Sequence, residues 1–192
     1  MKKTLLLLPM WVLLGCQKND PSPAEQLPPA TQTGANTAGC VVDGLRWVAS
    51  TNARTMGGAP LSAVHASWGR VRPPAYHLSL SFDKQIDDKL DVHRRTYVRL
   101  ELPDITGPGT FVLDQRYNGL AQNGPIAYAA FTYYLPPPDQ EMRTGPATPG
   151  RVVVTRLDTV AHIVSGTFEF TARNASGRAT VRVTEGRFDC KF

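Results

Sequence analysis

Residues that commonly catalyse reactions or bind metals are few in this chain and widely separated. No two histidines have the HExxH spacing of a zinc site, and neither a G-x-S-x-G nucleophile elbow nor a Gly-rich phosphate loop occurs. We therefore expect no enzyme, and a hydrolase whose site is assembled from residues distant in the sequence is the less favoured alternative. The histidines are His65, His77, His93 and His162.

A cluster of acidic residues between positions 83 and 91 is the best candidate for a cation site. Hard cations such as Ca²⁺ need several oxygen ligands, but this spacing is not that of a Ca²⁺ loop and the cluster lacks a glycine at the tight turn. Lysines also interrupt it. The pattern favours a solvated loop, with no metal and no cofactor. The acids are Asp83, Asp87, Asp88 and Asp91.

The first of the three cysteines, Cys16, ends an apolar N-terminal segment. Lys2 and Lys3 precede ten apolar residues, 5–14, a stretch too short to span a bilayer and typical of a secretory signal peptide. Residues 13–16, LLGC, resemble the bacterial lipobox, in which the cysteine sulfur takes a diacylglyceryl group and the freed amine is acylated, commonly with palmitate. This resemblance implies that residues 1–15 are removed and that Cys16 anchors the protein to a membrane. The alternative is an ordinary cleaved signal peptide with an incidental cysteine.

The other two cysteines, Cys40 and Cys190, stand at opposite ends of the remaining chain. In an oxidising compartment two exported thiols more often form a disulfide than stay free, so we expect a bridge between them. The alternative is two unpaired thiols in the first and last strands. Neither cysteine has a second cysteine or a histidine at ligand spacing, which disfavours a metal site.

Residues 16–39 are expected to be the lipid anchor and a disordered tether, followed by a single domain over residues 40–192. The tether is rich in Pro, Thr, Gln and Ala and has almost no bulky apolar side chain to bury. Its start, QKND, resembles the signal that exports lipoproteins of Bacteroidota to the outer face of the outer membrane, with Asn19 in place of the first acid. We therefore expect an outer-membrane lipoprotein at the cell surface, or otherwise on the periplasmic face.

Apolar residues in the domain alternate with polar ones, which is the pattern of half-buried antiparallel strands. In HLSLSF, residues 77–82, every second residue is apolar, and TYVRLEL and VSGTFEFTA repeat the pattern. About nine such segments separated by turns predict an all-β fold, either an antiparallel β-sandwich or a closed β-barrel. The one possible helix is DKQIDDKLD, residues 83–91. Further strands are expected at 46–50, 61–68, 110–113, 127–135, 151–157 and 179–188.

The C-terminal half resembles an uncharacterised family of Bacteroidota envelope lipoproteins. The segments GRVVVTRLD, VSGTFEF and GRFD match its ITxLD, VSGTFxF and GRFD strands in order and spacing. The opening segment CVVDGLRWVAS is similar more loosely. The resemblance implies a β-domain of the cell envelope and adds no mechanism.

A long Pro-rich connection, residues 135–150, follows Tyr133 and Tyr134 and is the favoured binding surface. Long loops on a rigid β-scaffold often carry binding, and a tyrosine beside one could stack on a sugar ring or a protein partner. The alternative is a merely mobile hairpin loop. Residues 116–124 are a second, weaker candidate.

The sequence thus predicts a binding or structural protein whose partner is a glycan or an envelope protein. A barrel that carries a small apolar ligand is the alternative. The net charge of +5 falls by two when Lys2 and Lys3 are removed, and the arginines form no basic run, so we expect no nucleic-acid partner.

Asp158-Thr159-Val160 resembles the Asp-Thr-aliphatic acceptor of O-glycosylation in Bacteroidota, which makes Thr159 a candidate modification site. The same three residues could equally form an ordinary hairpin turn, because Asp accepts hydrogen bonds from nearby backbone amides.

Overall fold

The computed structural model describes residues 26–52, 54–72, 75–87, 93–115, 126–134 and 140–192. Within these ranges the chain forms an antiparallel sheet of eleven strands, and no segment is helical. The all-β expectation is therefore confirmed. The strands are β1 (Thr37–Val42), β2 (Leu45–Val48), β3 (Val64–Arg72), β4 (Ala75–Asp87), β5 (His93–Pro103), β6 (Gly109–Leu113), β7 (Tyr128–Tyr134), β8 (Gln140–Arg143), β9 (Gly150–Asp158), β10 (Ile163–Arg173) and β11 (Thr180–Lys191).

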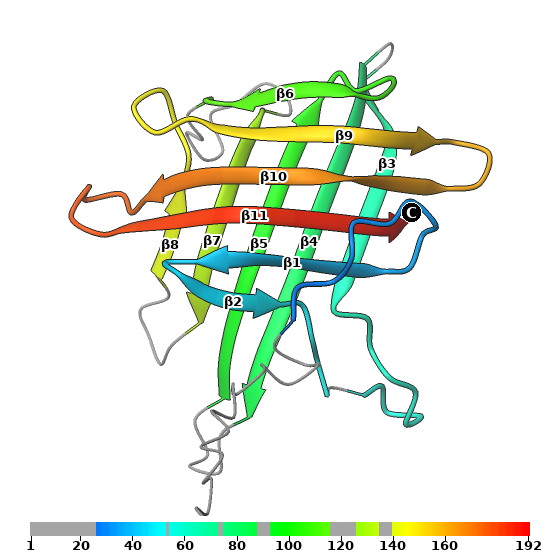
Figure 1. Cartoon of the computed structure of the whole chain (residues 1–192), viewed down its shortest axis with the longest axis horizontal. Helices are drawn as coiled ribbons and strands as arrows, with labels where there is room; N and C mark the ends of the chain where they lie inside the picture. Colours follow the sequence, from blue (N-terminus) through cyan, green and yellow to red (C-terminus); the bar gives the residue numbers. More distant parts are fainter. Residues whose placement is uncertain (1–25, 53, 73–74, 88–92, 116–125, 135–139) are drawn as a thin grey trace, which may run out of the picture.

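The sheet curls into an open half-barrel with two crossing layers (Figure 1). The strand order is β2-β1-β11-β10-β8-β7-β5-β4-β3, and β6 extends the sheet through β9, which pairs with β10. One layer contains β6, β9, β10, β11, β1 and β2, and the other contains β8, β7, β5, β4 and β3. The layers are joined where β10 meets β8 through the single pair Arg173 and Arg143. We call this junction the corner.

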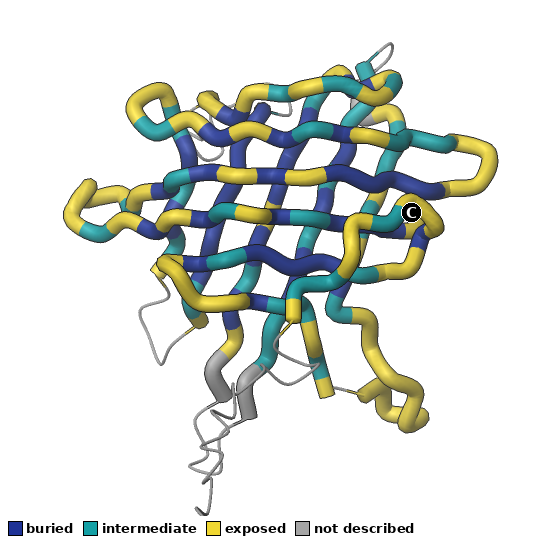
Figure 2. The backbone as a smooth tube through the Cα atoms, in the orientation of Figure 1, coloured by how far each residue is buried: buried dark blue, intermediate teal, exposed yellow. Residues whose placement is uncertain are grey.

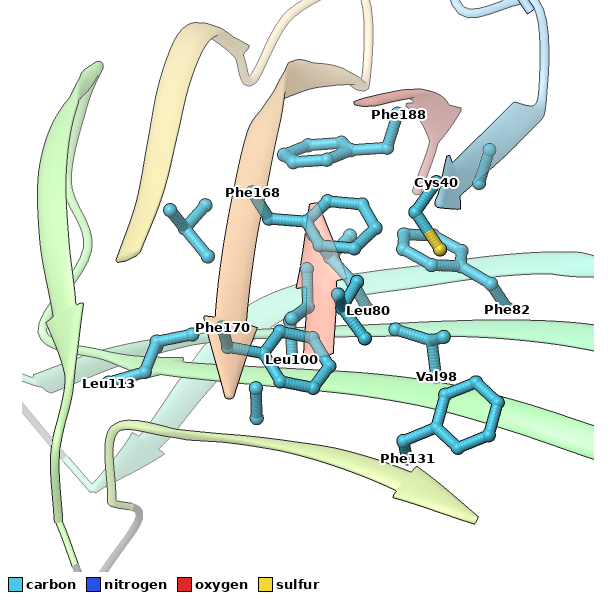
Figure 3. Close-up of a cluster of buried hydrophobic side chains, with 14 of the residues drawn as sticks. Cys40, Leu80, Phe82, Val98, Leu100, Leu113, Phe131, Phe168, Phe170 and Phe188 are labelled. Atoms are coloured by element: carbon cyan, nitrogen blue, oxygen red, sulfur yellow. The ribbon is translucent and has the colours of Figure 1, made fainter. Parts of the chain in front are cut away.

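The alternating pattern places apolar side chains between the two layers, where the buried positions concentrate (Figure 2). Phe82 lies at the centre, with its ring centroid 5.9 Å from that of Phe168 and 6.2 Å from that of Phe188. The Cys40 side chain points into the same aromatic cluster (Figure 3). Burial of rings of this size contributes about 1.5–3 kcal/mol each, so this cluster stabilises the contact between the two layers.

Two glycines allow neighbouring strands to approach closely over these rings. A Cβ atom added at Gly166 on β10 would collide with the Val153 carbonyl of β9, and one at Gly186 would collide with the Phe168 carbonyl and ring. Any larger residue at either position would therefore push the sheet apart.

The ordered domain begins before Cys40, which corrects the expected boundary of the tether. Residues 31–36 run beside the end of β11 and wrap around the carboxylate of Asp189, which is only 1% exposed. It accepts hydrogen bonds from Thr31 Oγ1 (2.6 Å), Thr33 N (2.9 Å), Gly34 N (2.8 Å) and Ser165 Oγ (2.7 Å). This strap has almost no apolar side chain, so hydropathy alone marks it as disordered, whereas polar contacts hold it in place.

Two other expectations about local structure are wrong. Residues 83–87 continue strand β4, so the possible helix at 83–91 does not form over the part that the structure describes. The expected loop at 135–150 contains strand β8, which pairs with β7 along its whole length. Both segments are too polar to show a clear period of two, and they become strands because their neighbours supply hydrogen-bonding edges.

The expected disulfide between Cys40 and Cys190 is also corrected, because both are free, buried thiols. The β1–β11 register pairs Thr37 with Asp189 and Gly39 with Arg187, so the two cysteines are offset by four positions along adjacent strands. At about 3.4 Å per residue this is roughly 13 Å, whereas a disulfide needs Cα atoms about 4.4–6.8 Å apart. Burial raises the pKa of each thiol to about 12.

None of the segments that the structure describes forms a helix long and apolar enough to cross a membrane.

Candidate binding site

A polar groove lies at the corner, between the turn that follows β8 and the turn that follows β10. Its volume is about 670 Å³, and two smaller hollows of about 420 and 320 Å³ lie on the outer face of β9, β10 and β11. We call the first the corner groove. It is lined by Glu141, Arg143, Thr144, Gly145, Pro146, Ala147, Thr148, Arg173, Asn174, Ala175, Ser176 and Gly177.

Two arginines face each other across the β8–β10 ladder in this groove. Arg143 and Arg173 are direct cross-strand partners, a position in which Cβ atoms are about 4.5–5.5 Å apart and like charges repel. Arg173 is exposed, and its side chain makes no ion pair or hydrogen bond with any residue in the described ranges. The corner therefore carries a positive charge that the ordered part of the protein does not neutralise.

Arg143, in contrast, is held in a fixed orientation. Its Nε and Nη2 donate to the two carboxylate oxygens of Glu141, each at 2.7 Å. Its guanidinium carbon also lies 5.9 Å from the ring centroid of Tyr128. A planar bidentate pair stacked on an aromatic ring keeps little rotational freedom, so Arg143 is preorganised.

Tyr128 links the groove to a layer of arginines and tyrosines on the outer face of β5 and β7. Arg99 hydrogen-bonds with the hydroxyls of both Tyr97 and Tyr128, and it lies over the Tyr97 ring. Burial raises the pKa of Tyr128, and the hydrogen bond from Arg99 offsets only part of that rise. The phenol therefore stays neutral and supports the arginines on either side of it.

The two turns add hydroxyl and amide groups to the groove. The Asn174 side-chain oxygen accepts a hydrogen bond from Ser176 Oγ (3.1 Å) and another from the Ala179 amide (3.2 Å), which fixes the turn after β10. Thr144 Oγ1 accepts from the Ala129 amide at 2.9 Å and fixes the start of the other turn. Both walls are thus held by their own side chains before any ligand arrives.

The side chains of His77, Ser79 and Glu101 form the arrangement closest to a catalytic triad. His77 Nε2 lies 2.8 Å from Glu101 Oε2, and the Ser79 hydroxyl donates to Glu101 Oε1 at 3.0 Å. The serine is therefore bonded to the acid and not to the imidazole, so the relay from serine through histidine to acid is not assembled. This geometry describes a half-buried polar pair on the sheet surface. In the described ranges, no group of three or more His, Cys, Asp or Glu side chains could hold a metal ion.

Tyr133 and Tyr134 point to opposite faces of β7, as expected for neighbours in a strand. Tyr133 packs inward, with its ring centroid 4.8 Å from that of Phe131, while Tyr134 is 39% exposed beneath Arg95. Neither tyrosine lines the corner groove. The expected surface and the groove share Glu141 and residues 143–148, whereas Tyr133 and Tyr134 lie outside the groove.

The other candidate residues have separate locations. Thr159 is exposed in the turn between β9 and β10, where the Asp158 carboxylate accepts hydrogen bonds from the Val160 and Ala161 amides. The hairpin turn proposed from the sequence therefore forms, and it leaves Thr159 accessible. Cys16 and the segment 116–124 lie outside the described residues.

Sequence reasoning missed Arg143 and Arg173 because thirty positions separate them. Arg143 lies in the segment expected to be a Pro-rich loop, and Arg173 directly follows an expected strand, so neither gives a local signal. Their relation depends on β10 pairing with β8, a contact between strands that are not consecutive in the chain.

Fold and site together define an all-β module with a filled interior and a polar groove on its outer surface. Residues 93–189 match the family model described as Domain of unknown function (DUF6252), and the chain belongs to this family. The match begins at β5 and ends at Asp189, so it includes every residue of the corner groove. No curated protein and no solved structure matches the chain.

Proposed function

We propose that this protein is an outer-membrane-anchored, surface-displayed lipoprotein whose β-domain binds a polar envelope ligand, a glycan or the polar surface of a protein, through the corner groove. The observation that carries the proposal is the exposed Arg173, which has no ion pair or hydrogen bond among the described residues and lies opposite Arg143 in a preformed groove of about 670 Å³. Small-ligand sites commonly occupy about 300–1,000 Å³ and contain a few fixed polar groups.

The filled interior argues against the alternative of a carrier for a small apolar ligand. Such a carrier needs a lumen, whereas the space between the layers is occupied by stacked rings of Phe82, Phe168 and Phe188 (Figure 3). A closed or sandwich-like form of the half-barrel would keep this packing. Binding is therefore assigned to the outer surface.

The anchoring part of the proposal rests on residues 13–16 and on the position of the strap. Because the strap at residues 31–36 is fixed to β11, at most residues 17–30 separate it from the proposed anchor, a reach of no more than about 43 Å at roughly 3.1 Å per residue. This is enough to keep the domain near the membrane surface while leaving its outer face accessible.

A blocking substitution tests the proposed function without changing any charge. Ala175 is exposed in the turn after β10 and lines the groove, so Ala175→Trp should fill the groove and leave the fold intact. Ala161→Trp, in the exposed turn at the other end of β10, is the matched control. On an array of neutral and acidic oligosaccharides and purified envelope proteins, the lipidated wild type and the control should bind a common set of ligands that Ala175→Trp does not bind. Equal binding by all three proteins would place the site elsewhere.

A further inference from the structure

We infer that the corner groove recognises a sugar unit that carries a carboxylate, with Arg173 and Arg143 as the groups that bind the anion. This inference rests on the proposed function and names the class of its ligand. It is carried by the charge, the geometry and the lining of the groove.

The charge of the groove calls for an anion. Arg143 and Arg173 are opposite each other in the ladder, and the one carboxylate that lines the groove, Glu141, is already engaged in a bidentate pair with Arg143. An anion placed between the two guanidinium groups would relieve their repulsion and supply Arg173 with a partner.

The two arginines also differ in a way that suits ligand capture. Arg143 is fixed by Glu141 and Tyr128, so a ligand binding to it loses little side-chain entropy. Arg173 is exposed and can close over a bound carboxylate from the opposite strand. One fixed and one adjustable arginine can together hold both oxygens of a carboxylate.

The size and lining of the groove favour a sugar over an inorganic anion. A volume of about 670 Å³ is many times that of one water molecule, which occupies about 30 Å³ in the liquid. The walls carry the side chains of Thr148, Asn174 and Ser176, which are suited to hydrogen-bonding the hydroxyl groups of a sugar ring. Pro146 and Ala147 provide small apolar surfaces against which a ring can lie.

The test uses the mature lipidated chain in detergent and isothermal titration with D-glucuronate, D-glucose and sulfate. We expect D-glucuronate to bind more tightly than either comparison compound, and its affinity to fall as salt is added. Arg173→Gln should weaken D-glucuronate binding by at least about tenfold, because it removes a charge-assisted hydrogen bond to the carboxylate. Arg46→Gln removes the same charge from an exposed position on β2, three strands away from β10, and should bind as the wild type does.

Thermal unfolding separates loss of binding from loss of fold. Because Arg173→Gln removes a like-charge pair, its melting temperature without ligand should equal or exceed that of the wild type. The inference is overturned if D-glucuronate does not bind, if D-glucose or sulfate binds equally well, or if Arg46→Gln and Arg173→Gln lose the same affinity. If Ala175→Trp abolishes ligand binding on the array while Arg173→Gln does not, the anion site is wrong and the proposed function stands. If Ala175→Trp binds the array ligands as the wild type does, the proposed function itself fails.

Discussion

The carboxylate of Asp189 should be the most important polar group for stability, because it closes the strap onto the last strand. We predict that Asp189→Asn destabilises the protein and releases residues 31–36 from the sheet. The carboxylate accepts two hydrogen bonds at Oδ1, from Gly34 N and Ser165 Oγ. Oδ2 accepts the others, from Thr31 Oγ1, the backbone and hydroxyl of Thr33, and Ala35 N.

The magnitude follows from where the amide of the new asparagine would lie. The loss of stability is smallest if the asparagine NH₂ group takes the place of Oδ1. There the Ser165 hydroxyl can rotate and accept a hydrogen bond from the NH₂ group, so only the Gly34 amide is left facing another donor. One unsatisfied buried donor and the loss of charge-assisted bonds together cost about 2–3 kcal/mol. Asp189→Ala removes every acceptor, and we expect about 3–5 kcal/mol.

Urea unfolding at several pH values and amide hydrogen exchange measure these effects. Burial favours the neutral acid, but the hydrogen bonds from Thr31, Ser165, Thr33 and Gly34 outweigh it and hold the pKa of Asp189 well below its usual range. The stability supplied by the carboxylate is therefore fully present above about pH 4 and is lost as the pH falls below that value. The difference in unfolding free energy between wild type and Asp189→Asn should therefore begin to shrink below about pH 4 and keep shrinking as the pH falls toward the lowered pKa of the folded state.

Asp114→Asn is the control, because Asp114 is exposed directly after β6 and makes no hydrogen bond or ion pair with residues 31–36. This variant should unfold much as the wild type does and leave exchange at residues 31–36 unchanged. The reasoning about the strap is refuted if Asp189→Asn also matches the wild type in both measurements.

Three further predictions concern the sheet, the thiols and the anchor. Gly166→Ala should lower the free energy of unfolding, measured by urea titration, by about 1–3 kcal/mol or more, because the new Cβ would collide with a β9 carbonyl. The control is Gly69→Ala on β3, which has open space around it and should be neutral or slightly stabilising. Cys40 and Cys190 should react with a thiol reagent in the absence of reductant only after unfolding, because both are buried and their pKa values are raised. A disulfide would contradict this, and it would show as a mass lower by two hydrogen atoms with no reactive thiol after unfolding. Cys16→Ser should move the protein from the membrane fraction to the soluble fraction, and mass spectrometry that finds an unmodified N-terminus at another residue would contradict the anchor.

The strands that the sequence predicts well are those with one face in the core. Leu78, Leu80 and Phe82 alternate with polar residues and are fully buried, so their period of two records the geometry directly. The sequences of strand β8 and the strap show no such alternation, because hydrogen bonds to strands distant in the sequence determine where these segments lie. Asp189 illustrates the difficulty, since its partners in the strap lie more than 150 positions away in the sequence.

The disulfide expectation failed for a related reason. Counting cysteines gives a plausible pair, but only the register between β1 and β11 shows that Cys40 and Cys190 are four positions out of alignment. The groove was similarly hidden, because Arg143 and Arg173 become neighbours only when β10 turns the corner onto β8. Pairing between strands distant in the sequence therefore decides whether the two cysteines and the two arginines meet. The periodicity within one segment carries no information about that pairing.

Photocrosslinking on intact cells tests the central claim, that ligand binds at the corner groove, most directly. A photoreactive residue is placed at position 175 in the groove or at position 161 in the turn at the other end of β10. We predict an adduct at position 175 with a ligand that is absent at position 161, and loss of this adduct when free D-glucuronate competes. Adducts of equal yield and identity at both positions, or none at position 175, would contradict it.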